Sequence, residues 1–349
     1  MISAARTVAF DVLRRVHEGA FASDLLLAKA KGLNSRDAGL ASEIVFGCLR
    51  YQHQPDYLIA SLATKLDIEV RIALRMAIYQ IRHLDRVPAH AAVAESVELV
   101  KRARKRSAAG LVNALLRKVN REPSQWPDRA TELSCPEWLL SRWDREFGRE
   151  TTDRIARAYL SPPETHIATT GRVQDVGSQS IVPLLELEPG QTFLDLCAAP
   201  GNKTAQAIEH GVQAIACDVH VHRLLNVPTT NCRRVALDAT EPLPFAGETR
   251  FDRILVDAPC SGTGTLGRNP EIKWRIKPSD LTELHHKQVT ILSNAITHLK
   301  PGGRIVYSTC SLEREENEEV IEAVGGAWKS TRRIPGIDAG DGFFAAVLA

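Results

Sequence analysis

The 349-residue sequence contains seven cysteines but no C-x-x-C pair, and it has no long apolar run. An odd number of cysteines without that spacing is typical of reduced thiols in a cytoplasm, not of a disulfide framework. No apolar run approaches the roughly 18–20 residues that span a bilayer, and the N-terminus lacks the pattern of a signal peptide. Candidate metal ligands are scarce, because the histidines at 220 and 222 and the adjacent pair at 285 and 286 are best explained as solvated or packed. We therefore expect a cytoplasmic protein with no membrane partner and no metal.

The net charge of +2 is unevenly distributed. Residues 1–122 carry 20 Lys or Arg against 12 Asp or Glu, whereas the remainder carries 24 against 30. Such an excess of positive charge predicts contact with a polyanion. A solvated helix end is the alternative for a short basic run, but the charge of the whole segment favours RNA contact. The densest run contains Lys101, Arg102, Arg104, Lys105 and Arg106.

Helical periodicity dominates the first 122 residues. Apolar residues at 5, 8, 9, 12, 13 and 16 follow the i, i+3, i+4, i+7 spacing of one buried helix face. Similar patterns cover 72–84, 89–100 and 108–119, and Ser23 and Asn34 each resemble a helix N-cap. Beyond a proline-bearing stretch at 122–127, a helical pattern runs from Pro136 to about residue 160. We expect an all-α domain over 1–125 and a shortened helical connector over 126–172.

From about residue 181 the pattern changes to strands that alternate with helices. Short apolar runs at 193–196, 214–217, 254–256 and 305–307 indicate buried strands, and 342–348 indicates a final strand. A long helix is predicted over 281–299, ended by the Pro-Gly-Gly at 301–303. Strands alternating with helices predict a doubly wound α/β sheet in the third domain, 173–349.

The loop after the first predicted strand has small side chains and opens a helix. Small residues let a ligand approach the backbone, and a helix N-terminus favours an anionic group. This loop has neither the P-loop spacing nor the dinucleotide G-x-G-x-x-G pattern. Acids at successive strand ends, where ribose hydroxyls are commonly bound, add to a prediction of a nucleoside cofactor; Lys203 is alternatively a solvated lysine. The candidate residues are Cys197, Ala198, Ala199, Pro200, Gly201, Asn202, Lys203, Asp218, Asp238 and Asp257.

Two further cysteines each follow a predicted buried strand. Cys260 stands in DAPCSGTG and Cys310 stands in YSTCS. The carboxyl ends of parallel strands meet at one edge of a sheet, where ligands and chemistry gather. Both thiols are therefore expected to act on one substrate, one attacking it and one helping it leave. The alternative for any single cysteine is a small buried hydrophobe, which we predict for Cys48, Cys135, Cys217 and Cys232.

Four segments in this order, DLCAAPGNKT, DAPCSGTGT, RNPEIKW and STCS, resemble the RNA cytosine-5 methyltransferases of the Nol/Nop/Sun family. The N-terminal helices, with VNALLR at 112–117, resemble the NusB-like domain of its bacterial RsmB/Fmu/Sun branch. The resemblance implies an all-α N-terminal NusB-like helical domain followed by an α/β Rossmann-like class I methyltransferase domain. It also implies methylation of C5 of a cytosine in small-subunit (16S) ribosomal RNA, with S-adenosylmethionine as cofactor and a covalent Cys–C6 intermediate.

The resemblance also implies roles for individual residues. Cys310 is the expected nucleophile and Cys260 the group that assists release of the methylated base, while residues 197–203 with Asp218, Asp238 and Asp257 line the S-adenosylmethionine site. Asp257 is also expected to touch the cytosine edge and Lys273 to lie near the RNA, whereas Trp274 either packs in a core or stacks on a base. The expected partner is small-subunit ribosomal RNA, with no DNA, and the expected state is a monomer.

Some positions depart from the family pattern and leave alternatives open. Asn202 replaces the second glycine of the usual PGGKT loop, a change that costs least with asparagine if the position needs a positive φ. Val176 replaces an acid of the usual QDEAS element, and the stretch before it is shorter than usual. One alternative is a DNA C5-methyltransferase in which Cys260 attacks, against which Cys310 and the basic helical domain argue. The others are a non-catalytic RNA-binding assembly factor and methylation of a different RNA.

Overall fold

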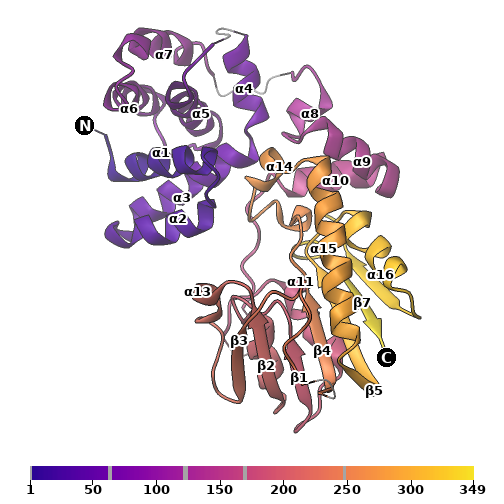
Figure 1. Ribbon diagram of the computed structural model, residues 1–349. Coiled ribbons are helices and arrows are strands. Elements are labelled where there is room, and N and C mark those ends of the chain that lie inside the picture. Colours follow the sequence, from indigo (N-terminus) through magenta and orange to yellow (C-terminus); the bar gives the residue numbers. More distant parts are fainter. Residues whose placement is uncertain (1, 62–64, 121–124, 168–170, 247–248) are drawn as a thin grey trace. The chain divides into compact units, whose positions relative to one another are not determined.

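The computed structural model describes the chain except for residues 1, 62–64, 121–124, 168–170 and 247–248. The chain forms two compact units (Figure 1). The first comprises Met1–Pro162 together with Leu266–Trp274, and the second comprises Pro163–Thr265 together with Arg275–Ala349. Among the described residues, no helix is both long enough and apolar enough to cross a membrane.

The first unit is helical, as the sequence predicts. One core is shared by its N-terminal helices, where Phe10, Ile44, Leu74 and Leu99 are at most 2% exposed. The helices are α1 (Ala4–His17), α2 (Ala22–Lys29), α3 (Ser35–Arg50), α4 (His53–Ala60), α5 (Ile68–His83), α6 (Ala89–Arg102), α7 (Ala109–Leu116), α8 (Arg129–Glu132), α9 (Glu137–Phe147) and α10 (Arg149–Ala158).

The predicted helix starts have different outcomes. The Asn34 side chain accepts a hydrogen bond from the Asp37 backbone N at 2.9 Å, so the predicted N-cap of α3 is confirmed. The prediction for Ser23 is wrong, because α2 begins at Ala22 and Ser23 lies inside it. The helical pattern predicted from Pro136 to about residue 160 forms two helices, α9 and α10. Gly148 lies between them with φ 79°, a conformation that favours glycine and interrupts a helix.

The second unit is built on one sheet. Within the described residues, the strand order is β3-β2-β1-β4-β5-β7-β6. Strands β1 to β5 pair in parallel, and β7 is antiparallel to both of its neighbours. The strands are β1 (Thr192–Asp195), β2 (Gln213–Asp218), β3 (Cys232–Ala236), β4 (Phe251–Asp257), β5 (Leu299–Thr309), β6 (Lys329–Arg333) and β7 (Phe343–Leu348).

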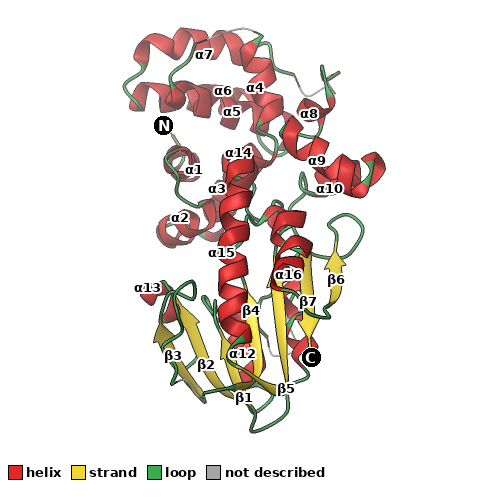
Figure 2. Cartoon of the chain, turned by 45° about the vertical axis from the view of Figure 1, so that its right-hand side comes forward, coloured by secondary structure: helices red, strands yellow, loops and turns green. Residues whose placement is uncertain are grey.

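Both faces of the sheet are covered, as a doubly wound sheet requires. On one face, Ile291 of α15 and Val320 of α16 pack with alternate strand residues such as Ile254; Figure 2 shows α15 running along this face. On the other face, Val182 and Leu255 belong to a second core cluster. The helices of this unit are α11 (Val176–Gln179), α12 (Asn202–Ile208), α13 (Val221–Leu224), α15 (Pro278–Ile296) and α16 (Glu318–Val324). The predicted α/β architecture is confirmed.

Two details of the sheet differ from the sequence prediction. Strand β6 has no counterpart among the predicted strands, and β3 was indicated only by the acid that follows it, Asp238; both strands lie at an edge of the sheet. The helix predicted to reach residue 299 ends at Ile296, and the Pro-Gly-Gly at 301–303 lies inside β5. The pairing of β4 with β5 shifts register between Phe251 and Arg253, so the strand accommodates this stretch as an irregularity.

Candidate active site

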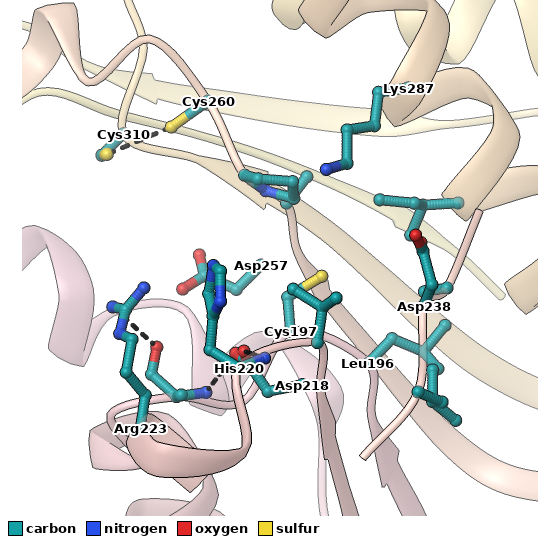
Figure 3. Close-up of a pocket in the computed structure, with 17 residues that line it drawn as sticks. Leu196, Cys197, Asp218, His220, Arg223, Asp238, Asp257, Cys260, Lys287 and Cys310 are labelled. Atoms are coloured by element: carbon teal, nitrogen blue, oxygen red, sulfur yellow. Dashed lines mark hydrogen bonds between the residues drawn. The ribbon is translucent and has the colours of Figure 1, made fainter.

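A cavity of about 300 Å³ opens at the carboxyl ends of the central strands. The strand order reverses between β1 and β4, and ligands of open α/β sheets bind at such a point. Figure 3 shows the two cysteine sulfur atoms facing each other at one end of the cavity and Asp238 at the other. The lining residues are Leu196, Cys197, Ala199, Asp218, Val219, His220, Arg223, Leu237, Asp238, Ala239, Asp257, Ala258, Pro259, Cys260, Lys287, Ile291 and Cys310.

Some members of the predicted cofactor set line this cavity and others do not. Cys197, Ala199 and the three acids line it. The remaining loop residues, Ala198, Pro200, Gly201, Asn202 and Lys203, are absent from its wall. The sequence prediction did not include His220, Arg223, Lys287 or Ile291. The pattern of α15 was visible in the sequence, but which of its turns meets the cavity depends on how the helix packs on the sheet.

The loop after β1 turns sharply at Gly201. Its φ is +108°, and a Cβ there would lie 2.8 Å from the Cα of Val227, so only glycine fits without strain. Asn202 is the first residue of α12 and is not among the residues with positive φ. The left-handed backbone conformation in this loop is therefore adopted by Gly201. Asn202, which replaces the second glycine of the family pattern, does not need a positive φ.

Asp218 and Asp195 accept hydrogen bonds from this loop and from the residues next to it. Asp218 is 8% exposed, and its carboxylate accepts the backbone N–H groups of Ala199 at 3.1 Å and His220 at 2.8 Å. Asp195 is buried and accepts the Thr204 hydroxyl at 2.7 Å. Burial raises the pKa of Asp195 to about 7, against the opposing hydrogen bond from Thr204.

Asp238 and Asp257 differ in their environments. The Thr240 hydroxyl and backbone N–H hydrogen-bond to Asp238 and lower its pKa. Asp257 accepts Lys203 Nζ at 2.6 Å and the Ser308 hydroxyl at 2.8 Å. Burial acts to lower the pKa of Lys203, but the Asp257 carboxylate outweighs it and the net shift is upward. Lys203 is therefore a nearly buried ammonium paired with Asp257, not a solvated lysine.

The two motif cysteines meet at the ends of adjacent strands. Cys260 follows β4, Cys310 follows β5, and their Sγ atoms are 3.2 Å apart. The hydrogen bond with Cys310 and burial raise the pKa of Cys260 well above its usual range. The raised pKa keeps Cys260 protonated, and the two sulfur atoms lie within hydrogen-bond distance of each other.

Lys273 lies in α14 (Ile272–Arg275), and its segment folds with the helical unit. Its side chain is buried, with Nζ donating to the carbonyl oxygen of Arg50 at 2.8 Å. Burial lowers the pKa of Lys273 to about 8. Trp274 Nε1 donates to the carbonyl oxygen of Leu49 at 2.7 Å, and the ring of His53 lies beside the indole. The RNA contact of Lys273 stays a prediction, and the described geometry gives its ammonium a structural partner.

The basic run at the end of α6 is partly neutralised. Lys101 pairs with Glu98 at 2.7 Å, Arg102 with Asp11 at 3.0 Å and Lys105 with Asp67 at 3.0 Å. Arg104 and Arg106 are exposed, and neither forms an ion pair with any residue that the structure describes. These two guanidinium groups are therefore the members of the run that have no ion pair with a described residue.

The parallel sheet with one antiparallel strand, β7, and a cavity at its topological switch point is the architecture of a class I methyltransferase. Residues 182–332 match the family model described as 16S rRNA methyltransferase RsmB/F, and residues 3–121 match that of the NusB family. The chain belongs to the RsmB family of ribosomal RNA small subunit methyltransferases.

Its similarity to members of that family extends over nearly the whole chain. It is 32% identical to the probable ribosomal RNA small subunit methyltransferase B of Bacillus subtilis (strain 168), covering 91% of this chain and 87% of that protein. It is 31% identical to ribosomal RNA small subunit methyltransferase B of Erwinia tasmaniensis, covering 98% of each. The crystal structure of PH0851 superposes with a TM-score of 0.82 at 21% identity, covering 99% of each chain, which supports the fold.

S-adenosylmethionine is the cofactor of this family, and the cavity residues fit it. Its sulfonium and ammonium groups are cationic, and the cavity wall contains the carboxylates of Asp218 and Asp238, besides that of Asp257, which is paired with Lys203. Asp218 ends β2, where an acid commonly holds ribose hydroxyls, and Asp238 follows the next strand, β3, in the same cavity wall. Leu237, Pro259 and Ile291 add apolar surface of the kind that a flat base needs.

Proposed function

We propose that this protein methylates C5 of a cytosine in 16S ribosomal RNA, in the cytoplasm, through a covalent bond between Cys310 and C6 of the base. The observation that supports this most directly is the 3.2 Å separation of Cys260 and Cys310 beside the cavity. One thiol can attack a base placed there while the second remains within reach of the same ring.

Cytosine needs such a nucleophile because C5 is unreactive while the ring is aromatic. Addition of a thiolate to C6 breaks the conjugation and leaves C5 as an enamine-like carbon. S-adenosylmethionine supplies an electrophilic methyl group to that carbon. The target base must leave its stack or come from a loop, since these atoms are not reachable within a helix.

The environments of the two cysteines support unequal roles. Cys260 keeps its proton, because the hydrogen bond with Cys310, burial and the nearby Glu316 carboxylate all raise its pKa. Cys310 lies within hydrogen-bond distance of that thiol and is the sulfur left to attack. We therefore give the attack to Cys310, and the thiol of Cys260 orients its sulfur before the base arrives.

Release of the product needs a base that removes the C5 proton. Once the sulfur of Cys310 is bonded to C6, it cannot be a thiolate, so its contribution to the raised pKa of Cys260 is lost. Cys260 then loses its proton to solvent more readily, and the resulting thiolate takes the C5 proton. The electron pair of that C–H bond forms the C5–C6 double bond and expels the Cys310 thiolate. One proton is released per methyl group transferred, and the thiol pair returns to its starting state.

The RNA-contact part of the proposal concerns the helical unit. Lys or Arg side chains that neutralise phosphates supply most of the sequence-independent affinity for nucleic acid. Arg104 and Arg106 are exposed and have no ion-pair partner among the described residues. We propose these two as the phosphate contacts within the basic run.

Methyl transfer from labelled S-adenosylmethionine tests the proposal. The full chain is incubated with 16S ribosomal RNA, transfer RNA or duplex DNA, and the nucleosides are separated after digestion. Label in 5-methylcytidine from 16S RNA alone is expected, at one position on bisulfite mapping. Label in another nucleoside would overturn the C5 proposal, label chiefly in transfer RNA or DNA would overturn the substrate, and no label in any acceptor would favour a non-catalytic factor.

A further inference from the structure

We propose that Glu316 is a positioning residue. It fixes the loop after β4, which carries Cys260 (the Cys260 loop), relative to the loop after β5, which carries Cys310 (the Cys310 loop). The proposal rests on the proposed function, since it concerns the two thiols that carry that reaction. Glu316 ends the 3₁₀ turn Arg314–Glu316, and its side chain is fully buried. It touches neither sulfur through a hydrogen bond, so it acts through the residues next to the cysteines.

The carboxylate receives hydrogen bonds from both loops. Its Oε1 accepts the backbone N–H of Ser261 at 2.7 Å and the Nε2 of Gln288 at 3.0 Å. Its Oε2 accepts the hydroxyls of Ser261 and Ser311. Because Ser261 follows Cys260 and Ser311 follows Cys310, one side chain joins the residues directly after the two thiols.

The chemistry of this junction favours a carboxylate. An ionised carboxylate is acceptor-only and has about four lone-pair sites, which matches four converging donors. Taking such a charge out of water is costly, and here it has hydrogen-bond donors in place of water. Burial raises the pKa of Glu316, while the hydrogen bonds from Ser261 and Ser311 oppose that shift. The free-energy cost of burying the Glu316 carboxylate is offset only while Ser261 and Ser311 both donate to it. Because one serine lies in each loop, the positions of the two loops are coupled.

The next residue provides a contrast. Asn317 donates to the carbonyl oxygen of Ser311 at 3.0 Å and accepts the hydroxyl of Thr309 at 2.5 Å. Both contacts are to the Cys310 loop. Backbone contacts also join the loops, since Gly264 N donates to the carbonyl oxygen of Cys310 at 2.9 Å. Loss of the Glu316 side chain is therefore expected to loosen the separation of the sulfur atoms without unfolding the loops.

The separation of the two thiols can be measured without methyl transfer, using phenylarsine oxide. This arsenical binds tightly only where two thiolates can reach one arsenic atom. We compare the full chain with Glu316→Ala, Glu316→Gln and Glu318→Ala, and a Cys260→Ser variant defines affinity without the pair. Glutamine keeps the shape: its carbonyl can accept from Ser261 N and Gln288, and its amide can donate to the two hydroxyls. Glu318, which pairs with Arg332, is the matched control from the same segment.

Glu316→Ala is expected to weaken arsenical binding at least about tenfold and to slow single-turnover methylation by about 100-fold, as a misplacement near 1 Å does. The Kd for S-adenosylmethionine should stay within about twofold of the wild-type value, since Glu316 does not line the cavity. Glu318→Ala should behave like the wild type, and Glu316→Gln should lose less than Glu316→Ala because it keeps the hydrogen-bonded shape. If Glu316→Ala does not fold, Ser311→Ala removes one of the donors and is expected to give a smaller loss of the same kind.

Wild-type arsenical affinity and methylation rate in a folded Glu316→Ala or Ser311→Ala variant would overturn the positioning role. Equal losses in Glu316→Gln and Glu316→Ala would also overturn it, because the charge and not the hydrogen-bonded shape would then be what matters. A wild-type protein that binds the arsenical through both cysteines, loses that binding in Glu316→Ala and forms no 5-methylcytidine would contradict the proposed function alone.

Discussion

The sulfur atoms of Cys260 and Cys310 lie 3.2 Å apart although the residues are 50 positions apart in the chain. Parallel pairing of β4 with β5 produces this proximity, since each cysteine lies just beyond the carboxyl end of its strand. Close contact with Cys310 is the largest cause of the raised pKa of Cys260. The pair therefore contains one thiol, Cys260, that keeps its proton and lies within hydrogen-bond distance of the second sulfur.

Substitution of each cysteine should give opposite results in an adduct assay. Cys310→Ala removes the proposed nucleophile, so neither methyl transfer nor a covalent RNA complex is expected. Cys260→Ala leaves attack and methylation possible but removes the proposed base for release, so a complex that survives denaturing electrophoresis should accumulate. The measurement is gel mobility of the protein with labelled 16S RNA and S-adenosylmethionine. An adduct with Cys310→Ala and none with Cys260→Ala would reverse the roles.

Asp257→Asn should destabilise the second unit by about 2–4 kcal/mol, because removing one partner of a largely buried pair leaves a charge uncompensated. The Lys203 side chain is 10% exposed, and Asp257 is its ion-pair partner. Without that carboxylate, burial dominates and the pKa of Lys203 should fall below its unfolded value. The unfolded variant then binds more protons than the folded one. The loss in its free energy of unfolding relative to the wild type should therefore shrink as pH rises.

Urea unfolding at several pH values measures this effect. The double variant Lys203→Met/Asp257→Asn is the control, and it should recover part of the lost stability because neither charge remains. A double variant that is less stable than Asp257→Asn would show that the unpaired Lys203 ammonium is not what destabilises the Asp257→Asn variant.

The stability of the helical unit should rise with pH above about 8 because of Lys273. The pKa of Lys273 is lowered from 10.5 to about 8, chiefly by burial. Between these values the unfolded chain binds more protons than the folded one, so stability increases with pH through that window. We expect about 1–2 kcal/mol between pH 7.5 and 9.5, measured by urea unfolding followed by helical circular dichroism. Lys273→Met should flatten the rise, whereas Lys101→Met, at an exposed ion pair, should retain it.

Sequence patterns predicted the central strands well and the edges poorly. The central strands β1, β2, β4 and β5 are apolar because helices cover both of their faces. Strand β3 reads CRRVA and β6 reads KSTRR. An edge strand meets solvent on one side and tolerates charges that discourage further pairing, so it carries neither a continuous apolar run nor a clean alternation.

The candidate site was predictable where it depends on strand ends and not where it depends on packing. The acids after β2, β3 and β4 and the two cysteines could be placed at one edge from the sequence alone. Glu316 could not, because its importance depends on serines that come together only through the pairing of β4 with β5. The burial of Lys273 was equally hidden, since its partner Arg50 is 223 positions away in sequence.

RNA affinity should depend on Arg104 and Arg106 more than on their neighbours. Each is exposed and without an ion pair to the described residues, whereas Lys101 and Arg102 already have carboxylate partners. Each guanidinium that contacts a phosphate releases counterions, which contributes roughly 0.7–0.9 to the slope of log K against log salt. The variant Arg104→Gln/Arg106→Gln should therefore reduce that slope by about 1.4–1.8 and weaken binding of 16S RNA most at low salt.

The matched control for this prediction is Lys101→Gln/Arg102→Gln, which removes the same nominal charge from the same run. Its slope should change by less than half as much, because Glu98 and Asp11 already compensate these side chains. Fluorescence anisotropy with a labelled 16S RNA fragment at 50–300 mM salt gives both slopes. Equal changes in the two variants would mean that net charge alone governs binding, and an unchanged slope in the Arg104/Arg106 variant would place the RNA away from the end of α6.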